Sequence, residues 1–229
     1  MLRRTLKRMG WETLLRRSVR ALFGRKVEAD FTTSDKYWDD RYRNGGNSGA
    51  GSYGRLATFK SEVLNDFVGR NGIKSVIEFG SGDGNQLTLA NYPFYQGVDV
   101  SKTAVHSCRV RFAGDLNKKF MTLAEYDGQC AELSLSLDVI YHLVEDDTYD
   151  SYMTTLFAAA ERYVIVYASN MDDHTSALHV RHRKFTDWVS ANQSGFKLVS
   201  HIPNRYPFEP KDQTNSSFAD FFVFEAISS

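Results

Sequence analysis

The stretch Ser75-Val-Ile-Glu-Phe-Gly-Ser-Gly-Asp-Gly84 decides the fold. Its first half is short, largely apolar and rich in β-branched residues, which is typical of a buried strand. Its second half places glycines at positions 80, 82 and 84. Glycine lets the backbone adopt positive φ and approach a ligand closely. We therefore predict a strand that ends in a tight, ligand-binding turn.

Strand and helix patterns alternate on both sides of this turn. Apolar residues at helical spacing predict a helix over 55–68, and Ser101 and either Asp146 or Asp147 can cap two more helices. The expected strands are 75–79, 96–100, Phe120-Met121, 133–139, 163–168, 197–202 and 216–226. No helix is expected between the last two strands, so they should pair in antiparallel fashion. The pattern predicts an α/β fold, with a doubly wound, mostly parallel seven-stranded sheet and an antiparallel final hairpin.

The charge of the chain is zero overall but unevenly distributed along its 229 residues. Residues 1–26 carry nine basic side chains and one acidic one, which leaves 19 basic and 27 acidic side chains in the rest. An apolar helical face with arginines beside it is typical of a helix that lies on an anionic membrane surface. A solvated or docked helix, a mobile tail and a mitochondrial presequence fit the same residues.

Three parts of the chain differ in composition. Residues 1–30 form a basic amphipathic N-terminal arm, residues 31–54 are rich in aromatic residues and glycine, and the predicted domain spans 55–229. The middle part holds Trp38, Tyr42, Ser48 and Gly49, and is either a lid over a cofactor or a linker. Two cysteines exclude a disulfide framework and a Cys₄ zinc site, and no run is apolar enough to span a membrane. We expect a cytoplasmic protein, with its arm at the inner membrane face.

Carboxylates accompany the glycine turn. Glu78 lies two residues before the first glycine, and Asp99 ends the next expected strand, where it can accept hydrogen bonds from ribose hydroxyls. A dinucleotide fingerprint would need a third glycine at position 85, which is Asn85. A pyrophosphate would also be repelled by Glu78 and Asp83. A sulfonium cofactor carries a positive sulfur and an ammonium group and no phosphate, so carboxylates favour it.

From these residues the chain resembles the class I S-adenosylmethionine-dependent methyltransferases over roughly residues 70–226. The run 78–84 is similar to the family's first motif, Gly97–Ser101 to its acidic second-strand motif, and Ser136–Leu143 to its fourth-strand motif. The resemblance implies a Rossmann-like methyltransferase domain with S-adenosylmethionine as cofactor. It places Glu78 at the amino group and Asp99 at the ribose, and it suggests adenine contacts within 122–126. The implied cofactor residues are Glu78, Gly80, Ser81, Gly82, Asp99, Val100, Ser101 and Asp138.

The methyl acceptor is expected near His142. A hydroxyl nucleophile must be aligned with the sulfonium carbon and must lose a proton, which a histidine can accept. A packing or positioning role is the alternative for His142. Tyr141, His182 and Arg183 are predicted to bind the acceptor, because arginine fits anionic oxygens; a solvated basic loop and a metal site are the alternatives. No metal is predicted, since the histidine spacing does not give the usual helical pair.

These residues predict methyl transfer to an oxygen of a small-molecule or saccharide-type acceptor, including an anionic or lipid-linked one. The pattern Tyr-Trp-x-x-Arg-Tyr-x-x-Gly-Gly from Tyr37 is similar to small bacterial methyltransferases that are associated with surface-polysaccharide assembly. The sequence argues against a nucleic-acid acceptor, because the fourth-strand motif lacks the proline run of methyltransferases that modify base amines. The alternatives are an RNA-binding protein or RNA methyltransferase that uses the basic arm, and a nonenzymatic cofactor-binding subunit.

Overall fold

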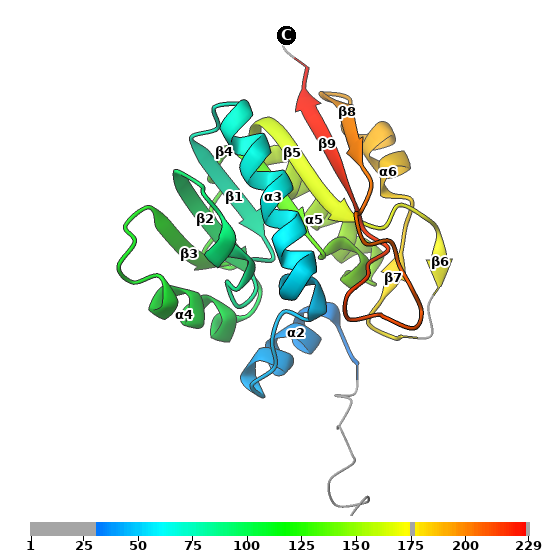
Figure 1. The fold of residues 1–229 in the computed structure, drawn as a ribbon, viewed down its shortest axis with the longest axis horizontal. Coiled ribbons are helices and arrows are strands. Elements are labelled where there is room, and N and C mark those ends of the chain that lie inside the picture. Colours follow the sequence, from blue (N-terminus) through cyan, green and yellow to red (C-terminus); the bar gives the residue numbers. More distant parts are fainter. Residues whose placement is uncertain (1–30, 175–176, 228–229) are drawn as a thin grey trace, which may run out of the picture. The chain divides into compact units, whose positions relative to one another are not determined.

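Seven strands form one mixed sheet in the computed structural model, which describes residues 31–174 and 177–227 (Figure 1). They are β1 (Ser75–Phe79), β2 (Phe94–Asp99), β3 (Lys118–Thr122), β4 (Ala131–Leu137), β5 (Ala160–Ala168), β8 (Phe196–Ile202) and β9 (Asp220–Ala226). Their order is β3-β2-β1-β4-β5-β9-β8. The first five in this order are parallel, and β9 is antiparallel to both of its neighbours. The predicted fold class, with its antiparallel final hairpin, is confirmed.

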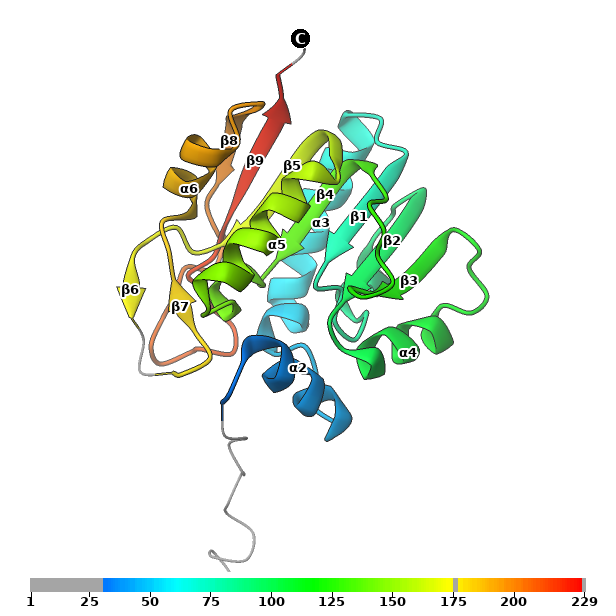
Figure 2. The ribbon, with the colours of Figure 1, turned by 180° about the vertical axis from the view of Figure 1, so that it is seen from behind.

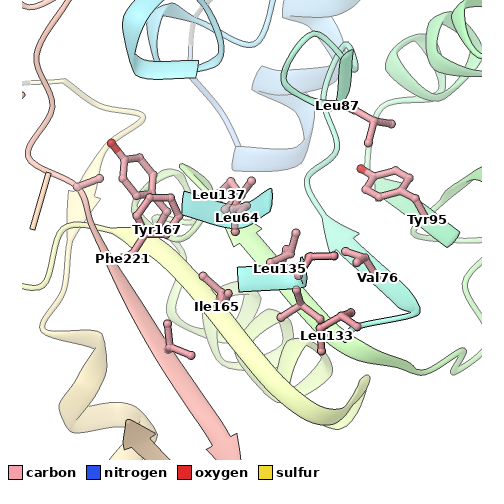
Figure 3. Packing of buried hydrophobic residues seen from close by; sticks show 14 of the residues in the cluster. Leu64, Val76, Leu87, Tyr95, Leu133, Leu135, Leu137, Ile165, Tyr167 and Phe221 are labelled. Atoms are coloured by element: carbon pink, nitrogen blue, oxygen red, sulfur yellow. The ribbon is translucent and has the colours of Figure 1, made fainter. Parts of the chain in front are cut away.

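Helices cover both faces of the sheet (Figures 1 and 2). α3 (Gly54–Arg70) lies across one face, and α5 (Asp146–Ala158) and α6 (Phe185–Asn192) cover the other. Successive strand residues point to opposite faces. Val76 therefore packs with Leu64 of α3, whereas its neighbour Ile77 packs with Met153 of α5. The first of these two clusters holds the labelled side chains of Figure 3.

The connection from β1 to β2 departs from the alternation of strand and helix. It holds only the 3₁₀ turn η2 (Gln86–Leu89). The face beside it is covered by α3, which precedes β1 in the chain, and by α4 (Lys102–Arg111), which follows β2. The predicted helix over 55–68 is confirmed as α3, whose buried residues include Leu56, Phe59 and Leu64.

The caps of α4 and α5 differ in how well they were predicted. Ser101 caps α4 as expected, since its hydroxyl accepts a hydrogen bond from the backbone N–H of Ala104 at 3.3 Å. The prediction that Asp146 or Asp147 caps α5 was wrong: Glu145 is the N-cap residue, and both aspartates lie in the first turn. Carboxylates in a first turn are stabilised by the positive end of the helix dipole.

Some elements had no counterpart in the sequence predictions. α2 (Ser34–Arg43), α6 and the two-stranded pair β6 (Asp173–His174) and β7 (Arg181–His182) were not expected. The predicted arm, residues 1–30, lies outside the described residues, so its helix and its membrane contact stay predictions. Within the part of the chain that the structure describes, no helix has the length and apolarity required to traverse a bilayer.

Candidate active site

A cavity opens beyond the carboxyl ends of β1, β2 and β4, where a doubly wound sheet binds its ligands. Its walls include the turn after β1, the residues that follow β2 and β4, part of α2, two residues of the segment 48–52, one side chain of α3 and two of α5. The predicted site residues that line it are Trp38, Tyr42, Ser48, Glu78, Gly80, Ser81, Asp99, Val100, Asp138 and His142. Those that do not line it are Gly49, Gly82, Ser101, Tyr141, His182 and Arg183.

The glycine turn is bent back onto β2. The backbone N–H groups of Gly80 and Ser81 both donate to the carbonyl of Val98, at 2.7 and 3.2 Å. Gly80 has a φ of +88°, and a Cβ atom built there would lie 2.4 Å from Cγ2 of Val139. Only glycine fits this position, because a side chain would be strained and would collide with the residue after Asp138.

Asp99 holds the turn from the neighbouring strand. Its Oδ2 accepts from the backbone N–H of Gly82 at 2.8 Å, and its Oδ1 accepts from that of Ser101 at 2.9 Å. Burial raises the pKa of this carboxyl group, and the two backbone hydrogen bonds oppose that rise. Each carboxylate oxygen can accept more than one hydrogen bond. Asp99 can therefore hold the turn and still accept hydroxyl groups of a ligand in the cavity.

Glu78 is a buried carboxyl group at the floor of the cavity. Burial raises its pKa to about 7, although the hydroxyl of Tyr95, which donates at 2.6 Å, and the charge of Lys60 both lower it. The group is therefore poised between its neutral and ionised forms near neutral pH. A cation bound in the cavity would favour the ionised form.

Lys60 and Asp138 form a buried ion pair beside Glu78. Nζ of Lys60 lies 2.7 Å from Oδ2 of Asp138, and the lysine side chain is only 1% exposed. The hydroxyl of Tyr141 donates to the other oxygen of Asp138 at 2.8 Å. Sequence reasoning missed Lys60, although a signal was present. Lys60 follows Leu56 by four residues on the apolar face of α3, where the helical spacing predicts an apolar residue.

His142 ends the 3₁₀ turn η3 (Ile140–His142), just after Asp138. Its Nδ1 lies 3.0 Å from the backbone carbonyl oxygen of His179. A carbonyl can only accept, so Nδ1 carries the proton and Nε2 keeps a free lone pair. Burial lowers the pKa of His142 to about 4, against the opposing effect of this hydrogen bond. The ring is therefore neutral at pH 7, in a form that can accept a proton.

The segment after α2 is fastened to the glycine turn. The backbone N–H of Ser48 donates to Oδ2 of Asp83 at 2.9 Å, and the backbone N–H of Asp83 donates to Oγ of Ser48 at 2.9 Å. The hydroxyl of Tyr53 donates to the same carboxylate oxygen at 2.7 Å. The hydroxyl groups of Tyr42 and Ser48 are hydrogen-bonded to each other at 2.9 Å. The lid hypothesis for 31–54 stays a prediction, and this segment lies where a lid would need to lie.

The other end of α2 is tied to the start of α5. The backbone N–H and the hydroxyl of Ser34 both donate to the carboxylate of Glu145, at 2.9 and 2.6 Å. On the side of α4, the hydroxyl of Ser101 donates to Asp39 at 2.9 Å. Contacts with α4, α5 and the glycine turn therefore hold α2 against the cavity, which Trp38 and Tyr42 line.

The predicted acceptor residues His182 and Arg183 are engaged elsewhere. Nδ1 of His182 lies 2.6 Å from the hydroxyl oxygen of Ser169, and both side chains are buried. Arg183 donates to the backbone carbonyls of Leu143 and Val144 and pairs with Asp146 at 3.0 Å. Their role in acceptor binding stays a prediction, without a contact to the cavity. Among the described residues, no group of three or more His, Cys, Asp or Glu side chains could hold a metal ion.

No family model and no curated protein matches this sequence. Solved structures are similar to it, among them the mitomycin 7-O-methyltransferase MmcR, with a TM-score of 0.60 and 13% identity over 95% of this chain and 68% of that one. Magnesium protoporphyrin IX methyltransferase ChlM from Synechocystis PCC 6803, with bound S-adenosylhomocysteine (SAH), has a TM-score of 0.57 and 17% identity, covering 85% of this chain and 98% of that one. The N-methyltransferase NodS from Bradyrhizobium japonicum WM9 has a TM-score of 0.56 and 12% identity, covering 83% and 99%.

These similarities establish the fold. The chain has the Rossmann-like fold of class I S-adenosylmethionine-dependent methyltransferases, as its motifs suggested. The names of MmcR and ChlM give two different acceptors, and NodS is named as an N-methyltransferase, so the shared fold does not select an acceptor.

Proposed function

We propose that this protein transfers a methyl group from S-adenosylmethionine. The observation that carries the proposal is the cavity at the carboxyl ends of the strands, where a glycine turn lies between Glu78, Asp99 and Asp138. S-adenosylmethionine is cationic at its sulfur and its amino group, and it carries a ribose with two free hydroxyls. A cavity lined by carboxylates suits both features. ChlM, whose structure has a similar fold, was solved with bound SAH, the demethylated form of this cofactor.

Each part of the cofactor has a matching group in the cavity. Glu78 and Asp138 would bind the ammonium group, and Nζ of Lys60, which lines the cavity beside Asp138, would bind the methionine carboxylate. Asp99 would accept hydrogen bonds from the ribose. Val100 and Leu123 line the cavity and are 41% and 46% exposed, so they offer apolar surface on which the adenine ring would pack.

His142 is proposed as the general base, which makes an oxygen acceptor the best fit. A hydroxyl must lose its proton as it attacks the methyl group; His142 lines the cavity, and because its Nδ1 is bonded to the carbonyl of His179, its Nε2 is left to take that proton. Arg183 is already paired with Asp146, so it lends no support to an anionic acceptor. We therefore propose an uncharged hydroxyl on a small molecule or a saccharide. The His142→Ala variant should keep its affinity for SAH and lose ~10²–10⁴ in turnover.

Isothermal titration calorimetry with SAH tests the cofactor assignment directly. The Asp99→Ala variant should bind SAH more weakly by ~1–3 kcal/mol, because hydrogen bonds to a charged acceptor are lost. Asp66→Ala is the matched control, since it removes a carboxylate from the exposed surface of α3. No binding of SAH to the wild-type protein at millimolar concentration would contradict the proposed function. Incubation with radiolabelled S-adenosylmethionine and fractionated cell extract would then identify the acceptor.

A further inference from the structure

Four aromatic side chains from three separate segments meet beside the cavity. Tyr37 and Trp38 belong to α2, His142 to η3, and His179 to the loop between β6 and β7. The ring centroids form a closed circuit of neighbours: 5.6 Å from Tyr37 to Trp38, 4.9 Å from Trp38 to His142, 5.7 Å from His142 to His179, and 4.6 Å from His179 to Tyr37. We call these four side chains the aromatic quartet.

The orientation of the rings in the quartet is specific. The planes of Tyr37 and His179 are within 15° of parallel, and those of His179 and His142 within 11°. Trp38 meets His142 edge to face, at an interplanar angle of 74°. Stacked and edge-to-face pairs are the favoured arrangements of aromatic rings. The ring of His142 is therefore held both by α2 and by His179.

The same loop residue fixes the proton of His142. The backbone carbonyl of His179 accepts from Nδ1, while its ring is parallel to that of His142. The hydrogen bond made by one ring nitrogen of a histidine decides which nitrogen is protonated. Rotation of the ring of His142 would break this bond, and the quartet opposes such a rotation.

We propose that the aromatic quartet keeps His142 in the Nδ1–H tautomer, so that Tyr37 and His179 are positioning residues for the base. This inference rests on the proposed function of His142. It makes α2 part of the catalytic machinery, because two of the four rings belong to that helix. Without the rings, the imidazole could turn, and the proton could occupy either nitrogen.

The charged and titratable groups around His142 are compatible with this role. Asp138 precedes it in the chain, Arg41 lies one helical turn from Trp38 on α2, and His179 faces it from the loop. The backbone carbonyl of His179 and the charge of Asp138 favour protonation of the ring, whereas the charges of His179 and Arg41 oppose it, and burial outweighs the other contributions to the pKa. The ring therefore stays neutral at pH 7, where its tautomer decides whether Nε2 can accept a proton.

Long-range proton–nitrogen NMR correlations of the full-length protein would test the proposal, since they report the tautomer of each histidine. In the wild-type protein at pH 7 we expect a single Nδ1–H tautomer for His142, with no titration between pH 8 and pH 5. Tyr37→Ala and His179→Ala should each give a mixture of tautomers and a titration midpoint that moves up toward 6.5. Tyr37→Phe and His179→Phe, which keep a ring in each place, should restore the wild-type spectrum.

The signals of His201 provide an internal reference, because that residue lies on the edge strand β8, in a separate ring contact. An Nε2–H tautomer of His142 in the wild-type protein would overturn the proposal. So would an unchanged tautomer in the Tyr37→Ala and His179→Ala variants, if their circular dichroism shows that they are folded. The readout needs neither cofactor nor acceptor, so its outcome is independent of whether SAH binds.

Discussion

Burial raises the pKa of the Glu78 carboxyl group, and this shift decides at which pH the group can bind a cation. Because that pKa is raised to about 7, the folded protein holds a proton there that an unfolded chain would release above pH 4.5. This group therefore lowers the free energy of unfolding as the pH rises from about 4.5 to 7. This loss of folding stability is consistent with a residue that serves ligand binding and not stability.

We predict that the affinity for S-adenosylmethionine rises with pH up to about pH 7, where Glu78 becomes ionised. Below pH 7, Glu78 must lose a proton before it can pair with the cationic cofactor, so the affinity should fall up to tenfold per pH unit. The measurement is calorimetric titration from pH 5.5 to 8.5. Glu78→Gln should bind more weakly with no such dependence, whereas Glu62→Gln, on the exposed surface of α3, should follow the wild type. The same curve for Glu78→Gln and wild type would exclude this role.

At the scale of elements, α3 is joined to the end of β4 by the pair of Lys60 and Asp138. Removing one partner of a buried ion pair leaves an uncompensated charge. Lys60→Met should therefore lower the free energy of unfolding by ~3–5 kcal/mol, as measured by urea denaturation. Lys102→Met, at an exposed position of α4, is the control and should change it little.

A second variant separates charge from packing at the same place. Adding Asp138→Asn to Lys60→Met removes the orphaned carboxylate and should recover a large part of the lost stability. If the double variant is less stable than Lys60→Met, the pair is not the source of the effect.

The elements that the sequence predicted are those whose signal is local. The turn at 80–84 follows from its glycines, and α3 follows from the spacing of Leu56, Phe59 and Val63. α2 escaped prediction because Ser34 and Tyr42 are its only buried residues, so it has almost no apolar stripe. The helix is held by hydrogen bonds to distant residues, and these leave no periodic pattern in the sequence.

The site was predictable to a similar extent. Glu78, Asp99 and His142 stand next to recognisable strand ends, so position alone pointed to them. The environment of His142 was not predictable, because it depends on the carbonyl of His179, 37 residues further along the chain. Arg183 was predicted to bind the acceptor because arginine fits anionic oxygens, and only the folded structure shows that it is paired with Asp146.

At the scale of the whole molecule, the sequence joins a strongly basic arm to an acidic body. We predict that the full-length protein binds vesicles that contain anionic lipid, because each basic residue near such a surface contributes about 1 kcal/mol. Changing Arg16, Arg17 and Arg20 to Gln should weaken this binding by about 3 kcal/mol, or roughly 100-fold. Co-sedimentation at several salt concentrations measures it. Equal binding to neutral vesicles, or binding to RNA in place of vesicles, would contradict the prediction.

The hydrogen bonds from Ser48 and Tyr53 to Asp83 bear on which step limits the rate of turnover. These bonds join residues 48 and 53 to the turn that would hold the methionine part of the cofactor. If the segment 31–54 is the lid that we predict, fresh cofactor enters and the spent nucleoside leaves only after these bonds have opened. We therefore expect departure of the spent nucleoside, and not the methyl transfer itself, to be the slowest event of each cycle.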